Sequence, residues 1–276
     1  MMVTSKQLNV VLDIGKTNVK LTFVNSINNK TVKSFTTKQI NINKYGIKTL
    51  NSELIIKWSL DKIRKIEKNT RLDKFVCTAH GTSIALIDYN DKEILACTDY
   101  EFKFDQFFDE YKKIAPKFSE SFTPFLEGGL NIGTQLYFLY RKKPNLILKT
   151  KYILNYPQYI AWKLTNNFSS EISYLGCHTH LWNFKKNKLS SLVNKLGIKN
   201  KFPPIKKAWD VVGQKKVGQS NLQVINGVHD SNASYLYFKN SGIKDFTLIS
   251  TGTWYILFNQ KTSLTDLNSN MDMLAN

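Results

Sequence analysis

Cysteine, arginine and long apolar runs are scarce in this chain of 276 residues. The three cysteines, Cys77, Cys97 and Cys177, are odd in number and widely spaced, so buried thiols fit better than disulfides. No apolar run approaches the roughly 18 residues of a membrane span, and residues 1–7 lack the apolar core of a signal peptide. We therefore expect a cytoplasmic protein with no membrane partner.

Acidic residues number 21 against 39 lysines and arginines, which gives a formal net charge of +18. Arginine occurs only at positions 64, 71 and 141, and lysine is spread through every segment. A nucleic-acid-binding protein usually gathers arginine, lysine and aromatic residues on one face. We predict no nucleic-acid partner and keep that class as a minor alternative. The positive charge suits small anionic substrates such as nucleotides.

A metal site is suggested only weakly by the sequence. His178 and His180 are two residues apart and could share one face of a strand as ligands. No third ligand stands at a suitable spacing from them. We therefore expect core or surface histidines and no structural metal held by the protein.

Residues 10–23, VVLDIGKTNVKLTF, read as two strands joined by a tight polar turn. Asp13, Gly15 and Thr17 in that turn could hold a metal and a phosphate, because glycine lets the backbone come close and the other two offer oxygen ligands. A P-loop is excluded, since position 10 is valine where that motif needs glycine, and strand-like alternation follows where it needs a helix. A plain hairpin turn is an equal alternative.

Residues 246–258, FTLISTGTWYILF, repeat this pattern. A polar residue stands two positions before a glycine in both stretches, Asp13 in the first and Ser250 in the second, and a threonine follows. Two hairpins of this size in one chain suggest a duplicated domain that faces itself across a cleft.

The remaining pattern alternates strands and helices, which favours an α/β fold. A third strand at 31–36 would complete an N-terminal meander, and 74–78 and 222–225 read as further strands. Apolar spacing predicts helices at 54–66, 104–115, 130–140, 151–164 and 230–238.

Three side chains stand where ligands are often bound. His80 follows the strand at 74–78 and could contact a polyhydroxylated ligand, although a histidine bonded to the backbone is equally compatible. Gln135 is an amide within an apolar helix and could face a ligand. Asp230 is a natural N-cap, and the helix dipole would also keep it ionised as a general base.

Taken together, four segments in this order resemble the FGGY carbohydrate kinases of the actin-like ATPase superfamily. They are DIGKTNVK at 13–20, TAHGTSIALID at 78–88, GVHDSNASYL at 227–236 and STGTW at 250–254. The resemblance implies an actin-like, ribonuclease H-like domain with a mixed sheet flanked by helices. It also implies transfer of the γ-phosphate of ATP to a hydroxyl of a ketose or deoxyketose, such as L-fuculose, L-rhamnulose or xylulose.

The resemblance also assigns roles residue by residue. Asp13 would organise the Mg²⁺ of Mg-ATP, and Asp230 would be the general base. The phosphates would be lined by Gly15, Lys16, Thr17 and Asn18, with Gly252 and Thr253 closing from the second domain. The sugar would be contacted by His80, Gly81, Gln135, His229 and Asp230.

Members of this family continue well beyond the second phosphate motif, whereas this sequence stops at Asn276. We therefore expect an N-terminal sugar-binding domain at 1–243 and the first hairpin of an incomplete second domain at 244–276, truncated at the C-terminus. A catalytically impaired fragment that binds sugar or nucleotide, and a non-kinase actin-like ATPase, are the alternatives. A homodimer stays open.

Overall fold

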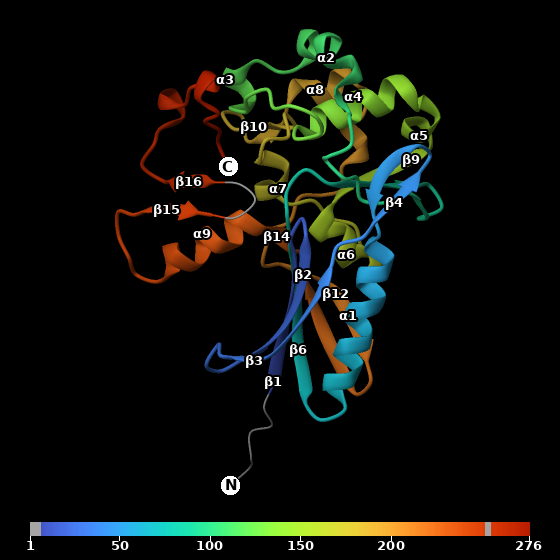
Figure 1. The fold of residues 1–276 in the computed structure, drawn as a ribbon, viewed down its shortest axis with the longest axis vertical. Helices are drawn as coiled ribbons and strands as arrows, with labels where there is room; N and C mark the ends of the chain where they lie inside the picture. Colours follow the sequence, from blue (N-terminus) through green and yellow to red (C-terminus); the bar gives the residue numbers. More distant parts are fainter. Residues whose placement is uncertain (1–6, 252–254) are drawn as a thin grey trace.

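A computed structural model describes residues 7–251 and 255–276. Its largest sheet has the strand order β12-β13-β6-β1-β2-β3, and β14 pairs with β6 (Figure 1). The antiparallel meander predicted at the N-terminus is confirmed, and β6 runs parallel to β1, β13 and β14. The strands are β1 (Gln7–Ile14), β2 (Asn18–Asn25), β3 (Thr31–Lys38), β6 (Arg71–Ala79), β12 (Val211–Val217), β13 (Ser220–Ile225) and β14 (Val228–His229). The α/β class with a mixed sheet is therefore correct.

Alternation along β1 decides which face of this sheet is covered. Leu8, Val10, Leu12 and Ile14 are buried, whereas the residues between them are partly exposed, as expected for a strand with one core face. Helices α1 (Ser52–Glu67) and α6 (Tyr156–Thr165) converge over Leu12 and the neighbouring strand β6. Asp13 therefore lies on the face opposite these two helices.

A second sheet, in the order β8-β7-β9, carries the chain away from the main sheet. Its strands are β7 (Ile84–Asp88), β8 (Glu93–Leu95) and β9 (Thr150–Asn155). The helix predicted at 151–164 is wrong in its first part, because residues up to Asn155 pair with β7 and α6 begins only at Tyr156. Pro157 stands in the first turn of α6, where its missing amide proton is not needed.

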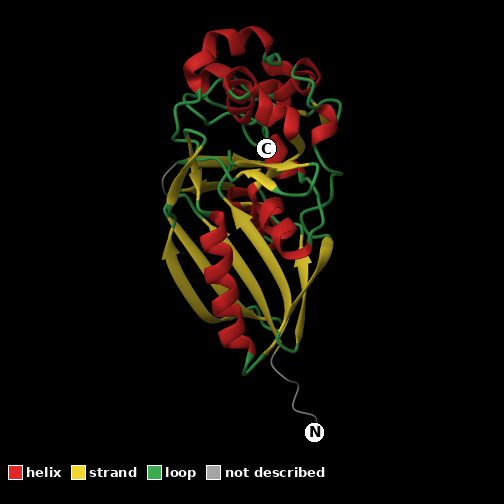
Figure 2. Ribbon diagram, turned by 90° about the vertical axis from the view of Figure 1, so that its right-hand side faces the viewer, coloured by secondary structure: helices red, strands yellow, loops and turns green. Residues whose placement is uncertain are grey.

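Most of the remaining helices gather at one end of the molecule, beyond the sheets (Figure 2). They are α2 (Phe108–Ile114), α3 (Phe118–Ser121), α4 (Ile132–Lys142), α5 (Pro144–Lys149) and α8 (Ser191–Lys195), whereas α7 (Ile172–Gly176) lies between this group and β14 (Figure 1). The segment predicted as a helix from 104 begins with a 3₁₀ turn at Asp105–Phe107. Short hairpins complete this part of the chain, β4 (Asn41–Lys44) with β5 (Ile47–Leu50) and β10 (Trp182–Asn183) with β11 (Lys188–Leu189).

The last part of the chain comprises α9 (Asp230–Asn240), β15 (Thr247–Ser250) and β16 (Ile256–Asn259). The second predicted hairpin is confirmed as an antiparallel strand pair, and Phe258 stacks on Tyr235 of α9 at 5.6 Å. No residue of α9 is buried. Six large apolar side chains, here called the α9–hairpin surface, are exposed: Leu236, Tyr237, Ile243, Ile249, Tyr255 and Leu257.

None of the helices in the described ranges is long and apolar enough to cross a membrane.

Candidate functional site

The ends of three parallel strands meet at one edge of the main sheet. Asp13 of β1 lies opposite Thr78 of β6, and Thr78 in turn lies opposite Val228 of β14. The carboxyl ends of parallel strands are where α/β proteins usually place their ligands. The sequence therefore brings Asp13, the loop after β6 and Asp230 to the same edge.

A glycine allows β14 to lie against β6. Gly227 has a φ of +88°, and a Cβ atom there would stand 2.5 Å from the carbonyl oxygen of Cys77. Any side chain at position 227 would push β14 and the following Asp230 away from β6.

The carboxylates of Asp13 and Asp230 influence each other. Burial raises the pKa of Asp13, the negative charge of Asp230 raises it further, and Lys20 acts in the opposite direction. Within the described residues Asp13 forms no ion pair. A half-buried carboxylate without an ion pair, as Asp13 is, is a suitable oxygen ligand for a hard divalent cation.

The turn between β1 and β2 is closed by a hydrogen bond from the Gly15 amide to the Asn18 carbonyl oxygen at 2.9 Å. A Cβ atom on Gly15 would stand 3.0 Å from that oxygen, which explains the glycine. Thr17 and Asn18 are exposed at the turn. No hydrogen bond within the described ranges uses the amide of Lys16 or Thr17, so both amides can donate to an anionic ligand.

The side chain of Lys16 has a different partner from the one that the resemblance implies. Its ammonium forms an ion pair with the buried Asp99, lies 3.2 Å from Glu101 Oε2 and stands 4.7 Å from the centre of the Tyr100 ring. Lys48 Nζ also lies 3.0 Å from Asp99 Oδ2. The Lys16 ammonium is therefore directed at the loop after β8, and only its backbone remains at the predicted phosphate turn.

His80 is buried directly after β6, and its two ring nitrogens have different surroundings. Its Nδ1 lies 2.9 Å from the Gly81 carbonyl oxygen, whereas its Nε2 is buried with no hydrogen-bond partner in the described part of the chain. The ring contacts Tyr100 and Tyr156 edge-on, each at 5.7 Å. Burial lowers the pKa of His80, so the neutral ring offers a single open nitrogen to a ligand.

Gln135 is fully buried in α4, and its amide is used by internal partners. Nε2 donates to the carbonyl oxygens of Thr82 at 2.7 Å and Gly129 at 2.6 Å, and Oε1 accepts from the Thr98 hydroxyl at 2.6 Å. Both amide protons are thus occupied. These hydrogen bonds favour a structural role for Gln135, as a brace that holds the loop after Gly81 in place, over a direct contact with a ligand.

Asp230 stands one position further into α9 than the sequence predicts. The N-cap residue is His229, and Asp230 is the first helical residue, so the expectation that Asp230 is the N-cap is wrong by one residue. Its Oδ1 accepts a hydrogen bond from the Ser231 amide at 2.6 Å. The side chain is 34% exposed. A carboxylate in the first turn is still favoured by the helix dipole.

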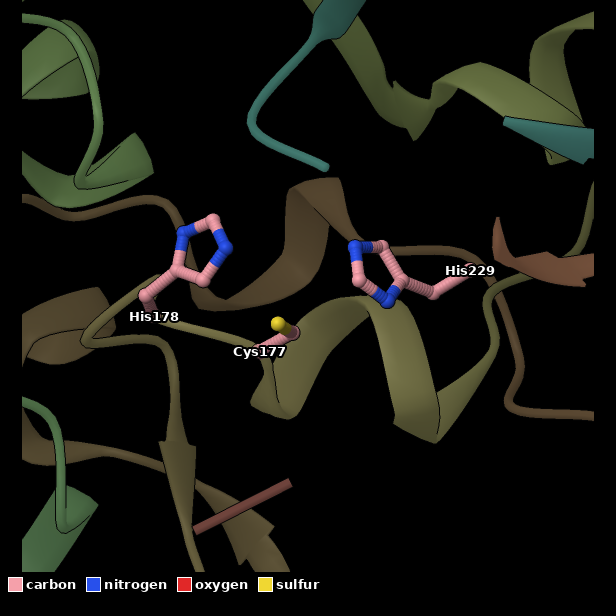
Figure 3. Close-up of side chains that lie close together, drawn as sticks. All are labelled: Cys177, His178 and His229. Atoms are coloured by element: carbon pink, nitrogen blue, oxygen red, sulfur yellow. The ribbon is translucent and has the colours of Figure 1, made fainter. Parts of the chain in front are cut away.

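His178 and His180 do not form the strand pair that the spacing allows. Both have positive φ angles, 40° and 63°, in a loop. The two ring nitrogens of His180 lie 2.7 Å from the Tyr111 hydroxyl and 3.0 Å from the Thr123 carbonyl oxygen. His178 instead lies beside Cys177 and His229 (Figure 3). Sequence spacing could not reveal this cluster, because His229 comes from a distant segment.

The remaining predicted contacts, Gly252 and Thr253, lie outside the described residues. All three cysteines are free and buried, as predicted.

Known structures were compared with this fold. A carbohydrate kinase from Novosphingobium aromaticivorans matches 95% of the chain at 29% identity with a TM-score of 0.86. The chain is related to the FGGY carbohydrate kinases. The match covers 58% of that kinase, and the FGGY fold present here is that of the N-terminal domain.

More distant FGGY kinases share the fold. A xylulose kinase from Lactobacillus acidophilus matches 83% of the chain and 49% of its own length, at 17% identity and a TM-score of 0.70. A Plasmodium falciparum glycerol kinase with ADP matches 83% of the chain and 50% of its own length, at 16% identity and a TM-score of 0.67. Neither a protein-family model nor a curated protein matches the chain.

Proposed function

We propose that this chain is the sugar-binding part of an ATP-dependent kinase that phosphorylates a hydroxyl of a ketose or deoxyketose. L-fuculose, L-rhamnulose and xylulose are the substrates to test first. The observation that carries the proposal is the meeting of Asp13 and Asp230 at the carboxyl ends of β1 and β14. With two carboxylates at one edge of the sheet, Asp13 can bind the metal of the nucleotide while Asp230 accepts a proton from the sugar.

On the nucleotide side, Asp13 would hold the Mg²⁺ of Mg-ATP. Its uncompensated carboxylate fits a hard cation. The exposed turn at Thr17 and Asn18, closed tightly by Gly15, offers free backbone amides to the phosphates. We leave the Lys16 ammonium out of this set because Asp99 already binds it. Gly252 and Thr253 stay proposed contacts from the second phosphate motif.

On the sugar side, Asp230 would accept the proton of the attacking hydroxyl. It is partly exposed in the first turn of α9, so a substrate can reach it. His80 Nε2 would bond a sugar hydroxyl, since it is buried with no partner in the described residues. Gly81 lies beside His229, which remains a proposed sugar contact together with Asp230. When bound, Mg²⁺ would neutralise the phosphate oxygens during transfer.

We also propose that residues 1–243 form the sugar-binding domain and that 244–276 begin a second domain. The α9–hairpin surface supports this division, because its six large apolar side chains are exposed and many exposed apolar side chains on neighbouring elements usually indicate contact with another folded unit. A second candidate function follows from the same surface. Residues 1–276 alone would then bind sugar or nucleotide with little or no phosphoryl transfer.

The decisive experiment measures ADP formation and thermal stabilisation in parallel over a panel of ketoses and deoxyketoses. Sugar-dependent ADP formation supports the kinase, whereas stabilisation without turnover supports the binding fragment. Asp230→Asn should abolish sugar phosphorylation and preserve nucleotide binding. Asp61→Asn, an exposed carboxylate on α1, is the matched control. Equal turnover by Asp230→Asn would refute its role as the base.

A further inference from the structure

Cys177, His178 and His229 bring a thiol and two imidazoles together in the interior. One ligand atom from each residue lies within 4.8 Å of the other two. Cys177 and His229 are 4% and 3% exposed, and His178 is partly buried. Figure 3 shows the two rings on either side of the sulfur, each with a nitrogen facing the space between them.

Hydrogen bonds fix both rings in the orientation that a metal ligand needs. His178 Nδ1 lies 3.0 Å from the Leu130 carbonyl oxygen, and His229 Nδ1 lies 2.8 Å from Asn232 Oδ1. An oxygen acceptor at each Nδ1 places the proton there. The Nε2 atoms of His178 and His229 then carry their lone pairs toward Cys177. Metal-binding histidines are usually held by such a second bond.

A glycine leaves the space between the rings open. A Cβ atom on Gly81 would stand 2.9 Å from His229 Nε2 and 3.1 Å from His178 Cε1. A larger residue at position 81 would therefore fill the region between the two imidazoles.

We propose that Cys177, His178 and His229 form a binding site for a zinc ion, in which His229 acts as a metal ligand in place of the direct sugar contact proposed above. One thiolate and two imidazole nitrogens are a zinc ligand set, and three protein ligands leave a fourth position for water or another oxygen. Asp230 Oδ1 lies 3.4 Å from His229 Nε2 and is the nearest carboxylate oxygen to that nitrogen. This oxygen favours zinc over monovalent copper, which prefers soft ligands.

The dimensions require only a small adjustment. Zinc–sulfur and zinc–nitrogen bonds of about 2.0–2.3 Å in a tetrahedron place ligand atoms about 3.3–3.8 Å apart. The ligand atoms are at most 4.8 Å apart in the structure. Small side-chain rotations that move these atoms by about an ångström would therefore bring them into the range for zinc.

Zinc binds a thiolate and neutral imidazoles, so its binding would release the thiol proton of Cys177 to the buffer.

The test uses the chain of residues 1–276, freed of metal with a chelator and titrated with Zn²⁺ and with Co²⁺. We expect one ion per chain, release of one proton, and a thiolate-to-cobalt charge-transfer band in the near ultraviolet. Cys177→Ser should remove the band and weaken Zn²⁺ binding by more than the ~10–100-fold that Asn232→Ala should cost through its bond to His229. No sugar or ATP is added, so the outcome is independent of the proposed kinase activity.

Cys97→Ala is the matched control, because Cys97 is equally buried but stands outside the cluster. It should keep both the band and the affinity. The absence of bound zinc in the wild-type chain would overturn the proposal, and so would a band that survives in Cys177→Ser. A site that takes copper and rejects zinc would overturn the assignment of the ion. If Cys177→Ser fails to fold, His178→Gln is titrated with Zn²⁺ instead, and an affinity equal to that of the wild type would overturn the proposal.

Discussion

The ammonium of Lys16, in the turn between β1 and β2, forms an ion pair with the carboxylate of Asp99, whose side chain has no exposed surface. Lys48 holds the same carboxylate from the other side at 3.0 Å. Burial alone would raise the pKa of Asp99, but the hydrogen bonds and charges of its partners bring it below its ordinary value. The buried ion pair of Asp99 therefore links the β1–β2 turn to the loop after β8.

Asp99→Asn should lower the free energy of unfolding by about 3 kcal/mol, because removing one partner of a buried ion pair leaves the other without compensation. Denaturant unfolding at pH 7 measures the loss. Glu101→Gln is the control, since Glu101 is 53% exposed and its pairs should contribute less than about 1 kcal/mol. Equal stability of Asp99→Asn and the wild type would show that the pair contributes nothing.

Glu93 should make the free energy of unfolding depend on pH. It accepts a hydrogen bond from the Tyr159 hydroxyl at 2.5 Å and lies near Lys163 and Lys44. Burial would raise the pKa of Glu93, but these three partners lower it below its ordinary value of 4.5. Because the pKa is depressed in the folded state, the stabilisation is complete above pH 4.5 and is lost as the pH falls through the folded-state value.

Glu93→Gln should therefore be less stable than the wild type at pH 7, and the difference should shrink as the pH is lowered below 4.5. Urea unfolding at a series of pH values measures both. A difference that stays constant down to pH 3 would contradict the prediction.

Gln135→Met should destabilise the fold by about 2–4 kcal/mol, because a side chain of similar size would leave the carbonyls of Thr82 and Gly129 without their donor. If the residue is a brace and not a sugar contact, the affinity for a bound sugar should change less than the stability. Calorimetric titration and thermal unfolding of the same variant separate the two. A variant of normal stability that no longer binds sugar would restore the ligand role.

His80→Phe should weaken sugar binding by a factor of about 5–13 and leave ATP binding unchanged. The ring would keep its edge-on contacts with Tyr100 and Tyr156, but it would lose the open Nε2. A hydrogen bond of this kind is worth about 1–1.5 kcal/mol, which corresponds to that factor. Unaltered sugar affinity would exclude His80 as a contact.

Local patterns in the sequence were sufficient for β1, β2, β3, β6 and β13 and for placing Asp13 and His80 at strand ends, but they did not predict β12 or β14. Alternation predicts β1, β2 and β3, and each strand ends at a change to small and polar residues. The boundary at Asn155 could not be found, because residues 151–155 suit a helix as well as a strand until their pairing with β7 is known.

Long-range contacts account for the side-chain partners that the sequence could not indicate. Nothing near Lys16 in the sequence indicates that Asp99 will bind it, and nothing near Gln135 indicates three internal partners. The cluster of Cys177, His178 and His229 has the same origin, since the segment after α7 and the distant strand β14 bring its members together. Sequence spacing can detect metal ligands that lie on one helix, strand or loop. It cannot detect a set of ligands that two distant segments contribute.

Tyr100 has Lys16 over one part of its ring and His80 against its edge. A shift of the β1–β2 turn on binding a nucleotide would therefore press on the ring that also positions the proposed sugar-binding nitrogen. Affinities linked in this way must change reciprocally, so a nucleotide that tightens sugar binding is itself bound more tightly once the sugar is present, and by the same factor. One aromatic ring would then couple the two affinities by a single factor, whichever ligand binds first.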